Sequence, residues 1–494
     1  MHRLVTPCAL APLLFLVPAC DCNDGTTPPP DGDLGVADRG PPNDAEADGD
    51  KNRVKPGIIG RHSALAASGG TLYASAYENT YGDLVLLSAK VSDLTTIAAE
   101  VVDGVPNVTA PAPGTYRGGI TSEGDNVGHQ TDIVASPTGE LLISYHDVTN
   151  RSLKVATRAG GKWATHTVAE PADDKEIVGR YTALAIVDNK PVIAYLVLNI
   201  TGKDGAFTSE VRAASAAKIL PAAAADWTIT LVDSQAMSCQ NLCASGEACV
   251  VKTDGSSACE KTGTGCDPQC ASGEACVAGT CKTALADAQH TDLPTAVGLW
   301  PCIVDAGGKP VVLYYDRVHG NLKGAIQDGT GWKLAVVKGN DSDDVGAFCS
   351  ATVSQAGIHV AYQDVGKLAL NYVELAPATL KPALTEVIDD GIRADGPHPV
   401  GADSAIAVDP SGKVHVIYQD AQNADLLAAV RAGANSWTPM DAQDKDLGRL
   451  LKGGARGYGF YSDLVQEGSK LYGSTFFFDQ SATPKGGLEL FGLE

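Results

Sequence analysis

The residues best suited to bind a ligand in this chain follow a glycine within a short segment that recurs seven times. The two positions after each glycine vary from copy to copy and carry mostly aromatic, basic and polar side chains. Such side chains can stack on a sugar or peptide, or hold an anionic group. The candidate ligand-binding residues are Arg61, His62, His129, Gln130, Arg180, Tyr181, Trp300, Phe348, Asp403 and Tyr461.

The segment recurs about every 50 residues, a period typical of propeller blades and other repeats. Within a unit, a strand of small residues precedes a turn such as 409–412, and a second strand then ends in an aromatic residue and often an acid. A third strand follows, and in several units a fourth begins with Trp. Four short strands repeated seven times predict an all-β fold, a seven-bladed β-propeller of four-stranded blades.

Two other architectures fit less well. The periodic runs are too short for helices and are interrupted by Gly and Pro. An array of β-sandwiches would require each unit of about 50 residues to bury a core alone, which is small for that purpose.

In a propeller, the innermost strands surround a central channel. The glycine segments enter those strands from one face, so the candidate residues are expected to converge at the channel mouth. They could bind a ligand there, or they could simply plug the channel.

Acidic residues recur in two patterns. Asp132 and Asp463 lie further into the first strand, where other units carry small residues. Because a buried carboxylate needs hydrogen-bond partners, a role in backbone capping is favoured over a metal or acid–base role. The acids that end the second strand are expected to cap turns; they are Asp147, Asp316, Asp364, Asp420 and Asp479.

No local signature of catalysis is present. The chain shows no nucleophile paired with a base and no histidine cluster with metal-ligand spacing, and its ten histidines are scattered. The repeats resemble those of sialidase-type propellers, but the Ser-x-Asp-x-Gly-x-x-Trp box of that family is absent. No glycosidase mechanism is therefore carried over, and neither a catalytic residue nor a metal or cofactor is expected.

Two quartets of cysteines lie between residues 239 and 281, and each contains Cys-Ala-Ser-Gly-Glu-Ala-Cys-Val. They predict a disulfide-rich insertion over 234–287, between the third and fourth blades, with zinc binding as the competing interpretation. The module resembles the small EGF-like repeats of extracellular proteins. Cys302 and Cys349 are expected to bridge neighbouring inner strands, or else to be two buried small residues. The cysteines expected in disulfides are Cys239, Cys243, Cys249, Cys259, Cys266, Cys270, Cys276, Cys281, Cys302 and Cys349.

The first residues indicate export. Residues 1–19 have the pattern of a signal peptide, and Val17–Cys20 resembles a bacterial lipobox, in which Cys20 is lipidated. Ordinary signal peptidase could cut the same bond. Residues 20–52 form an acidic linker whose composition is too polar to fold. This organisation resembles that of surface lipoproteins of Gram-negative bacteria, myxobacteria in particular.

The propeller is expected to span 53–494. Its last unit ends after a third strand, so residues 52–58 are predicted to supply the fourth strand and close the ring.

The net charge of −22 argues against nucleic acid as a partner, and it leaves a lipid anchor as the only contact with a membrane. The sequence predicts a monomeric outer-membrane lipoprotein, on the periplasmic or cell-surface side. It would bind a glycan, a peptide or an envelope protein at the channel mouth near the cysteine module, without catalysis. The alternatives are a glycan-active hydrolase or lyase that uses carboxylates at the same mouth, such as Asp403 with Asp132 or Asp463, and a structural envelope protein.

Overall fold

The structure is a computed structural model that describes residues 56–106, 116–202, 206–237, 239, 243–252, 257–285, 294–340, 342–440, 449–451, 453–479, 481 and 485–493. The predicted signal peptide, Cys20 and the acidic linker lie outside the described residues. In the part of the chain that is described, no helix is long and apolar enough to cross a membrane.

The strands form successive antiparallel sheets, so the predicted all-β propeller class is confirmed. The first blade contains β1 (Ile59–Ser68), β2 (Thr71–Glu78), β3 (Asp83–Lys90) and β4 (Asp93–Asp103). After the short 3₁₀ turn η1 (Tyr116–Gly119), the second contains β5 (Val127–Ala135), β6 (Leu141–Asp147), β7 (Ser152–Ala159) and β8 (Lys162–Ala169). The third contains β9 (Ile177–Val187), β10 (Lys190–Thr201), β11 (Phe207–Ala216), η2 (Ala224–Asp226) and β12 (Trp227–Met237).

A separate small sheet follows the third blade, at the predicted site of the cysteine insertion. It contains β13 (Glu247–Val251), β14 (Ser257–Lys261), β15 (Glu274–Val277) and β16 (Thr280–Leu285).

The chain then returns to the ring. The fourth blade contains β17 (Val297–Asp305), β18 (Pro310–Asp316), β19 (Asn321–Asp328) and β20 (Gly331–Lys338). The fifth contains β21 (Val345–Val353), β22 (Ile358–Asp364), β23 (Ala369–Leu375) and β24 (Pro382–Asp389), and is followed by the hairpin β25 (Ile392–Arg393) and β26 (Gly396–Pro397). The sixth contains β27 (Val400–Val408), β28 (Val414–Asp420), β29 (Asp425–Gly433), β30 (Ser436–Pro439) and β31 (Arg449–Leu451). The seventh contains β32 (Arg456–Glu467), β33 (Lys470–Asp479) and β34 (Gly486–Leu493).

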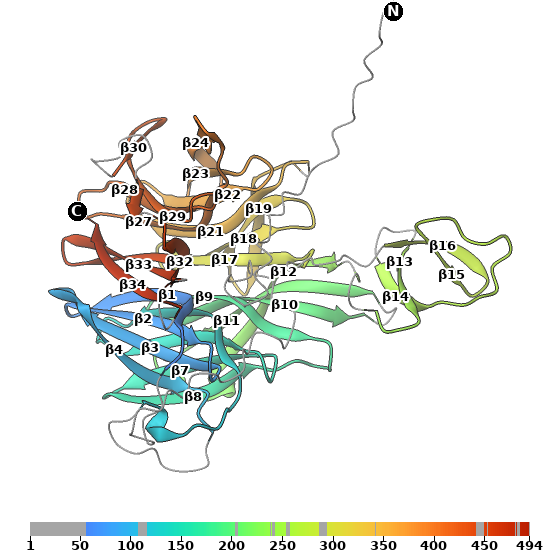
Figure 1. Cartoon of the computed structure of the whole chain (residues 1–494), viewed down its shortest axis with the longest axis horizontal. Helices are drawn as coiled ribbons and strands as arrows, with labels where there is room; N and C mark the ends of the chain where they lie inside the picture. Colours follow the sequence, from blue (N-terminus) through green and yellow to red (C-terminus); the bar gives the residue numbers. More distant parts are fainter. Residues whose placement is uncertain are drawn as a thin grey trace, which may run out of the picture.

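The innermost strand of each blade packs against the innermost strand of the next. β32 of the seventh blade packs against β1 of the first, so the ring closes. Figure 1 shows the blades gathered around these inner strands, with the cysteine module extending away from the ring beyond the ends of β10 and β12.

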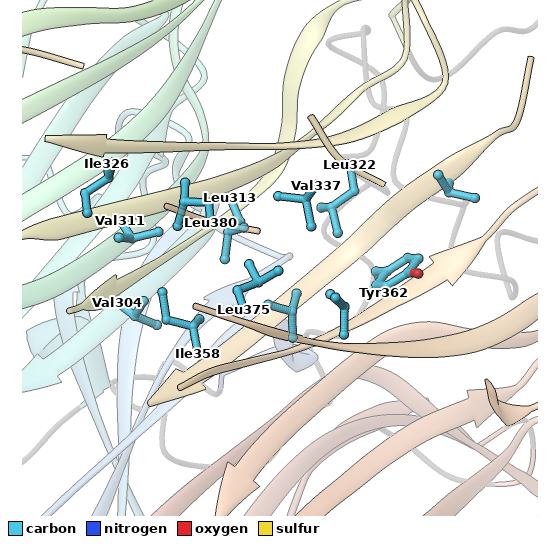
Figure 2. Close-up of a cluster of buried hydrophobic side chains, with 13 residues drawn as sticks. Val304, Val311, Leu313, Leu322, Ile326, Val337, Ile358, Tyr362, Leu375 and Leu380 are labelled. Atoms are coloured by element: carbon cyan, nitrogen blue, oxygen red, sulfur yellow. The ribbon is translucent and has the colours of Figure 1, made fainter. Parts of the chain in front are cut away.

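The core lies between the blades rather than within them, and a separate apolar cluster fills each interface between neighbouring blades. Figure 2 shows the cluster between the fourth and fifth blades, where Leu313 and Leu322 face Ile358 and Leu375. These side chains have almost no exposed area. Burial of this kind contributes about 25 cal/mol per Å² of apolar surface, so each blade depends on its neighbours for stability.

The acids that end the second strands cap the following turns, as predicted. Asp316 Oδ1 accepts the backbone N–H of Val318 at 3.1 Å, and Asp420 Oδ1 accepts that of Gln422 at 3.0 Å. Asp147, Asp364 and Asp479 make equivalent bonds.

The predicted closure by an N-terminal strand is wrong for residues 56–58. Gly57 N donates to Glu78 Oε1 at 2.8 Å and Ile58 N donates to Asn79 Oδ1 at 3.0 Å, so this segment is attached to the end of β2. Residues 52–55 lie outside the described residues. Among the described residues, the seventh blade has three strands.

Candidate functional site

One non-glycine residue in each innermost strand has a left-handed backbone, and it is always the second residue after the glycine of the repeat. Non-glycine residues rarely adopt this conformation, which costs on the order of 1–3 kcal/mol. The seven residues are His62 (φ 54°), Gln130 (49°), Tyr181 (50°), Trp300 (43°), Phe348 (51°), Asp403 (46°) and Tyr461 (48°).

A β-bulge accompanies each left-handed residue. In the first blade, Arg61 pairs with Tyr77 and Ala64 pairs with Ser75, so the inner strand contains one more residue than its partner at this point. The pairing shifts at the same place in the other blades. A bulge redirects a side chain out of the regular alternation of a strand. Here it turns one side chain from every blade toward the propeller axis.

The seven left-handed residues surround a cavity of about 170 Å³ near the beginning of the innermost strands. The residue that follows each of them lines the same cavity, so every blade contributes two neighbouring residues. These second residues are Ser63, Thr131, Thr182, Pro301, Cys349, Ser404 and Ser462.

Aromatic rings form two groups around this cavity. On one side, Trp300 lies 4.4 Å from Phe348 and 5.5 Å from Tyr181, measured between ring centroids. On the other side, His62 lies 4.9 Å from Tyr461. Gln130 and Asp403 come from the blades between these groups. The lining therefore combines flat apolar faces with a few polar groups, as ligand sites usually do.

The polar residues of the lining also join neighbouring blades. Gln130 Oε1 accepts the backbone N–H of Tyr181 at 2.8 Å. In three blades, the hydroxyl after the left-handed residue donates to the carbonyl of the left-handed residue in the preceding blade; the pairs are Ser63 with Tyr461 (3.0 Å), Thr182 with Gln130 (2.9 Å) and Ser404 with Phe348 (3.1 Å).

Asp132 and Asp463 follow the lining residues in the inner strands, and their carboxylates accept backbone hydrogen bonds, as predicted. Asp132 accepts the N–H groups of Ile133 and Leu184 at 2.7 and 2.6 Å. Asp463 makes the matching pair of bonds to its own blade and to the next. Burial raises the pKa of Asp132 to about 7 and that of Asp463 to about 6, despite these bonds.

Of the ten predicted site residues, seven line the cavity and three do not. Arg61, His129 and Arg180 directly follow their glycines, and none of them is among the lining residues. His129 and Arg180 are buried. The His129 ring stacks on that of His62 at 4.7 Å, so it supports a lining residue from behind.

The histidines near the mouth are held neutral. Burial, together with the positive charges of Arg61 and Arg180, lowers the pKa of His62 to about 3. Burial also lowers the pKa of His129, and it lowers that of His146 to about 3. Neutral imidazoles can donate and accept hydrogen bonds, whereas they attract anions only weakly.

Sequence reasoning missed the second residue that each blade contributes to the cavity. Five of these seven positions carry Ser or Thr, and that regularity is visible in the sequence. Since each of these positions directly follows a predicted site residue, the recurring Ser or Thr could have identified them from the sequence.

The cysteine module is joined to the third blade close to this mouth. Ser257 Oγ donates to the carbonyl of Met237, the last residue of β12, at 3.3 Å, and Ala206 bridges to Ala258. Cys239 and Cys249 belong to an apolar cluster that also includes Tyr181, with Trp300 packed against it. The module therefore stands beside the mouth as a projection, and Figure 1 shows that its second half extends outward.

All ten cysteines expected in disulfides are paired. Within each quartet the first pairs with the third and the second with the fourth. Since disulfide sulfurs are not thiolates, this pairing disfavours zinc. The disulfides are Cys239–Cys249, Cys243–Cys259, Cys266–Cys276, Cys270–Cys281 and Cys302–Cys349.

No protein-family model matches the chain, and no curated protein matches it. Among solved structures, it resembles the Aleuria aurantia lectin in complex with Fucalpha1-6GlcNAc, at 11% identity and a TM-score of 0.40, over 78% of this chain and 96% of the lectin. It also resembles a polysaccharide lyase, at 10% identity and a TM-score of 0.45, over 92% of this chain and 94% of the lyase. The α-L-arabinofuranosidase of Fusarium graminearum in complex with arabinobiose has 10% identity and a TM-score of 0.41, over 90% of this chain and 96% of the enzyme. Likeness at these values does not specify a ligand or a reaction for this chain.

Proposed function

We propose that this protein binds a carbohydrate at the mouth of its propeller channel and does not transform it. The observation that carries the proposal is the set of seven left-handed residues, one per blade, that direct their side chains into one cavity. Backbone strain is retained where a function needs it, because an unstrained alternative such as glycine is available at every one of these positions.

The lining favours a sugar over a wholly apolar or wholly charged ligand. A sugar ring presents a face of C–H groups that packs on aromatic rings such as Trp300 and Phe348, and its hydroxyls can bond to Gln130, Asp403 and the serines. The cavity of about 170 Å³ is smaller than the ~300–1,000 Å³ of typical ligand pockets. It therefore suits one terminal ring of a glycan, with the rest of the chain outside.

The alternative of a glycan-active hydrolase or lyase has less support. Glycoside hydrolysis usually needs two carboxyl groups flanking the scissile bond. Among the described residues that line the cavity, Asp403 is the single acid. Asp132 and Asp463 are outside the lining, and each already accepts two backbone N–H groups.

An array of glycans and envelope fractions, probed with the purified full chain and coupled to analysis of released products, tests the proposal. Retention of a glycan without release is the expected result. Release of shortened products would instead support the alternative of a glycan-active enzyme. Absence of both would leave a structural envelope role, or capture of a peptide or protein through the cysteine module.

We also propose that the chain is exported and anchored to the outer membrane through Cys20. Disulfides such as Cys239–Cys249 are typical of exported proteins, and the lipobox-like Val17–Cys20 supports lipidation. Cys20→Ser should move the protein from the membrane fraction to the soluble fraction, whereas Cys22→Ser should not. Membrane retention of the Cys20 variant would contradict the anchor.

A further inference from the structure

A second cavity lies far from the mouth, at the turns that join the first and second strands of the last two blades. Its volume is about 660 Å³, which falls within the ~300–1,000 Å³ range of ligand pockets. The sixth blade contributes Asp409, Lys413 and His415, and the seventh contributes Lys470 and Leu471. We call this cavity the blade 6–7 groove.

The groove is lined by basic side chains in a strongly acidic protein. The chain has 59 acidic and 37 Lys and Arg residues, for a net charge of −22. Lys413 and Lys470 nevertheless both line this groove, and among the described residues the ion pair of Asp409 is with His415 and not with either lysine. Their positive charges are therefore available to a ligand.

The one acidic side chain among the described lining residues is already engaged. Asp409 Oδ1 accepts the backbone N–H groups of Ser411 and Lys413 at 2.8 and 3.0 Å, and Oδ2 bonds to His415 Nε2 at 2.9 Å. Asp409 stays ionised, because these hydrogen bonds lower its pKa to about 2 despite burial, but its one negative charge is outweighed by the two lysines of the lining. The Nδ1 atom of His415 is buried and has no hydrogen-bond partner.

Apolar residues form the other part of the groove. Val430, Met440, Leu471 and Leu493 line it together with Pro439. Val430, Pro439, Leu471 and Leu493 lie in strands of the sixth and seventh blades, and Met440 directly follows β30. A surface of this kind, with basic groups beside aliphatic ones, suits a molecule that has one charged end and one apolar end.

We propose that the blade 6–7 groove binds a small amphipathic anion, whose acidic group lies between Lys413 and Lys470 and whose apolar body packs on Val430 and Leu493. This site is separate from the carbohydrate cavity and would operate whether or not the mouth binds a sugar.

Fluorescence titration of the full chain with 1-anilinonaphthalene-8-sulfonate, an amphipathic anion, tests the proposal. The double variant Lys413→Gln/Lys470→Gln should weaken binding by at least about ten-fold, because it removes both charge-assisted contacts to the sulfonate. Lys309→Gln is the matched control. Lys309 is exposed and precedes β18 as Lys413 precedes β28, but it does not line the groove.

Competition separates the charge from the apolar contact. Decanoate should displace the bound fluorophore at a concentration at least about ten-fold lower than decanol, since only decanoate carries the acidic group. The proposal is overturned by the absence of saturable binding to the full chain or by unchanged affinity in the double variant. It is also overturned by an equal loss in Lys309→Gln, or by equal displacement by decanol.

Discussion

Asp463 Oδ2 accepts the backbone N–H of Leu65 at 2.7 Å and thereby joins the last blade to the first, across 398 residues of sequence. Ser63 Oγ donates to the carbonyl of Tyr461 at the same seam, and Gly70 N donates to Glu467 Oε1 at 2.6 Å. The inner strands of the ring are thus closed by side-chain bonds to backbone groups. Asp132 makes the same contact to Leu184 inside the ring, which provides a natural comparison.

Asp463→Ala and Asp132→Ala should each lower the free energy of unfolding by about 1–3 kcal/mol, because each leaves buried N–H groups without an acceptor. Chemical denaturation measures both losses. Only Asp463→Ala loosens the seam, so only this variant should show faster limited proteolysis within β32–β34. Equal proteolysis of the two variants would contradict a special role of Asp463 in closure.

The raised pKa values of these two carboxyl groups predict an unusual dependence on pH. An unfolded Asp has a pKa of about 3.9, whereas burial raises the pKa of Asp132 to about 7 and that of Asp463 to about 6. Between about pH 4 and about pH 7, the folded chain binds more protons at these two groups than the unfolded chain does. The free energy of unfolding therefore falls as pH rises through this range. The buried histidines act in the opposite sense, because their lowered pKa values destabilise the fold as pH falls below about 6.5.

The variant Asp132→Asn/Asp463→Asn isolates the carboxyl contribution. Its free energy of unfolding, relative to that of the unmodified chain, should rise by at least about 1 kcal/mol between about pH 4.5 and about pH 7.5. Urea denaturation at the two pH values measures the difference. Parallel behaviour of the two proteins would mean that neither carboxyl group has a raised pKa.

The glycines of the repeat are required by a close approach of the neighbouring blade. Gly179 has a φ of +88°, and a Cβ at this position would lie 2.7 Å from the Cα of Leu153. Gly412 has a φ of +86° with no atom within 4 Å of the same point. Gly179→Ala should therefore cost at least about 2 kcal/mol more than Gly412→Ala in denaturation experiments, since both pay the backbone strain and only one clashes. Similar losses would show that conformation alone selects glycine here.

The strain at the left-handed positions can be measured by comparing two small residues. Phe348→Gly and Phe348→Ala both remove the ring, but only alanine retains the strain of a φ of 51°. The glycine variant should be more stable than the alanine variant by about 0.5–1 kcal/mol, after its greater unfolded-state entropy is included. Thermal and chemical denaturation check this order. If alanine were the more stable, the strain at this position would be negligible.

The ligand affinity of the mouth should depend on its central aromatic residue. Trp300 contacts Tyr181, Tyr315 and Phe348. Trp300→Ala should weaken binding of any glycan retained by the array at least about 30-fold, as expected for a residue that contributes about 2 kcal/mol. Isothermal titration measures the change. Leu334→Ala, at an exposed position on the outer strand β20, should have no effect, and an equal loss there would place the site elsewhere.

The repeat predicted most of the fold because each unit carries its own signals. A glycine, a turn motif, an aromatic residue and an acid mark the strands locally, and the capping role of Asp316 follows from its place before a turn. Closure of the ring was not predictable in this way. It depends on Asp463 meeting Leu65, a contact between distant residues that no local pattern reveals.

The residues that line the cavity were predicted to within one position in each blade. In a regular strand, adjacent residues point to opposite sides, so the sequence does not show whether Arg180 or Tyr181 faces the channel. The bulge breaks this alternation, so that Tyr181 and Thr182 both line the cavity and Arg180 does not. The blade 6–7 groove had no signal in the sequence, because its residues come together only when the two blades pack.

The attachment of residues 56–58 to the first blade determines how the ring responds to mechanical load. Gly57 and Ile58 bond to Glu78 and Asn79, and Glu78 also holds the backbone N–H groups of Thr80 and Tyr81. A pull on the chain before residue 56 is therefore transmitted into the hairpin that β2 forms with β3. The bonds of Gly57 and Ile58 to the end of β2 would therefore take up the tension before it reached β1 and the bond between Leu65 and Asp463.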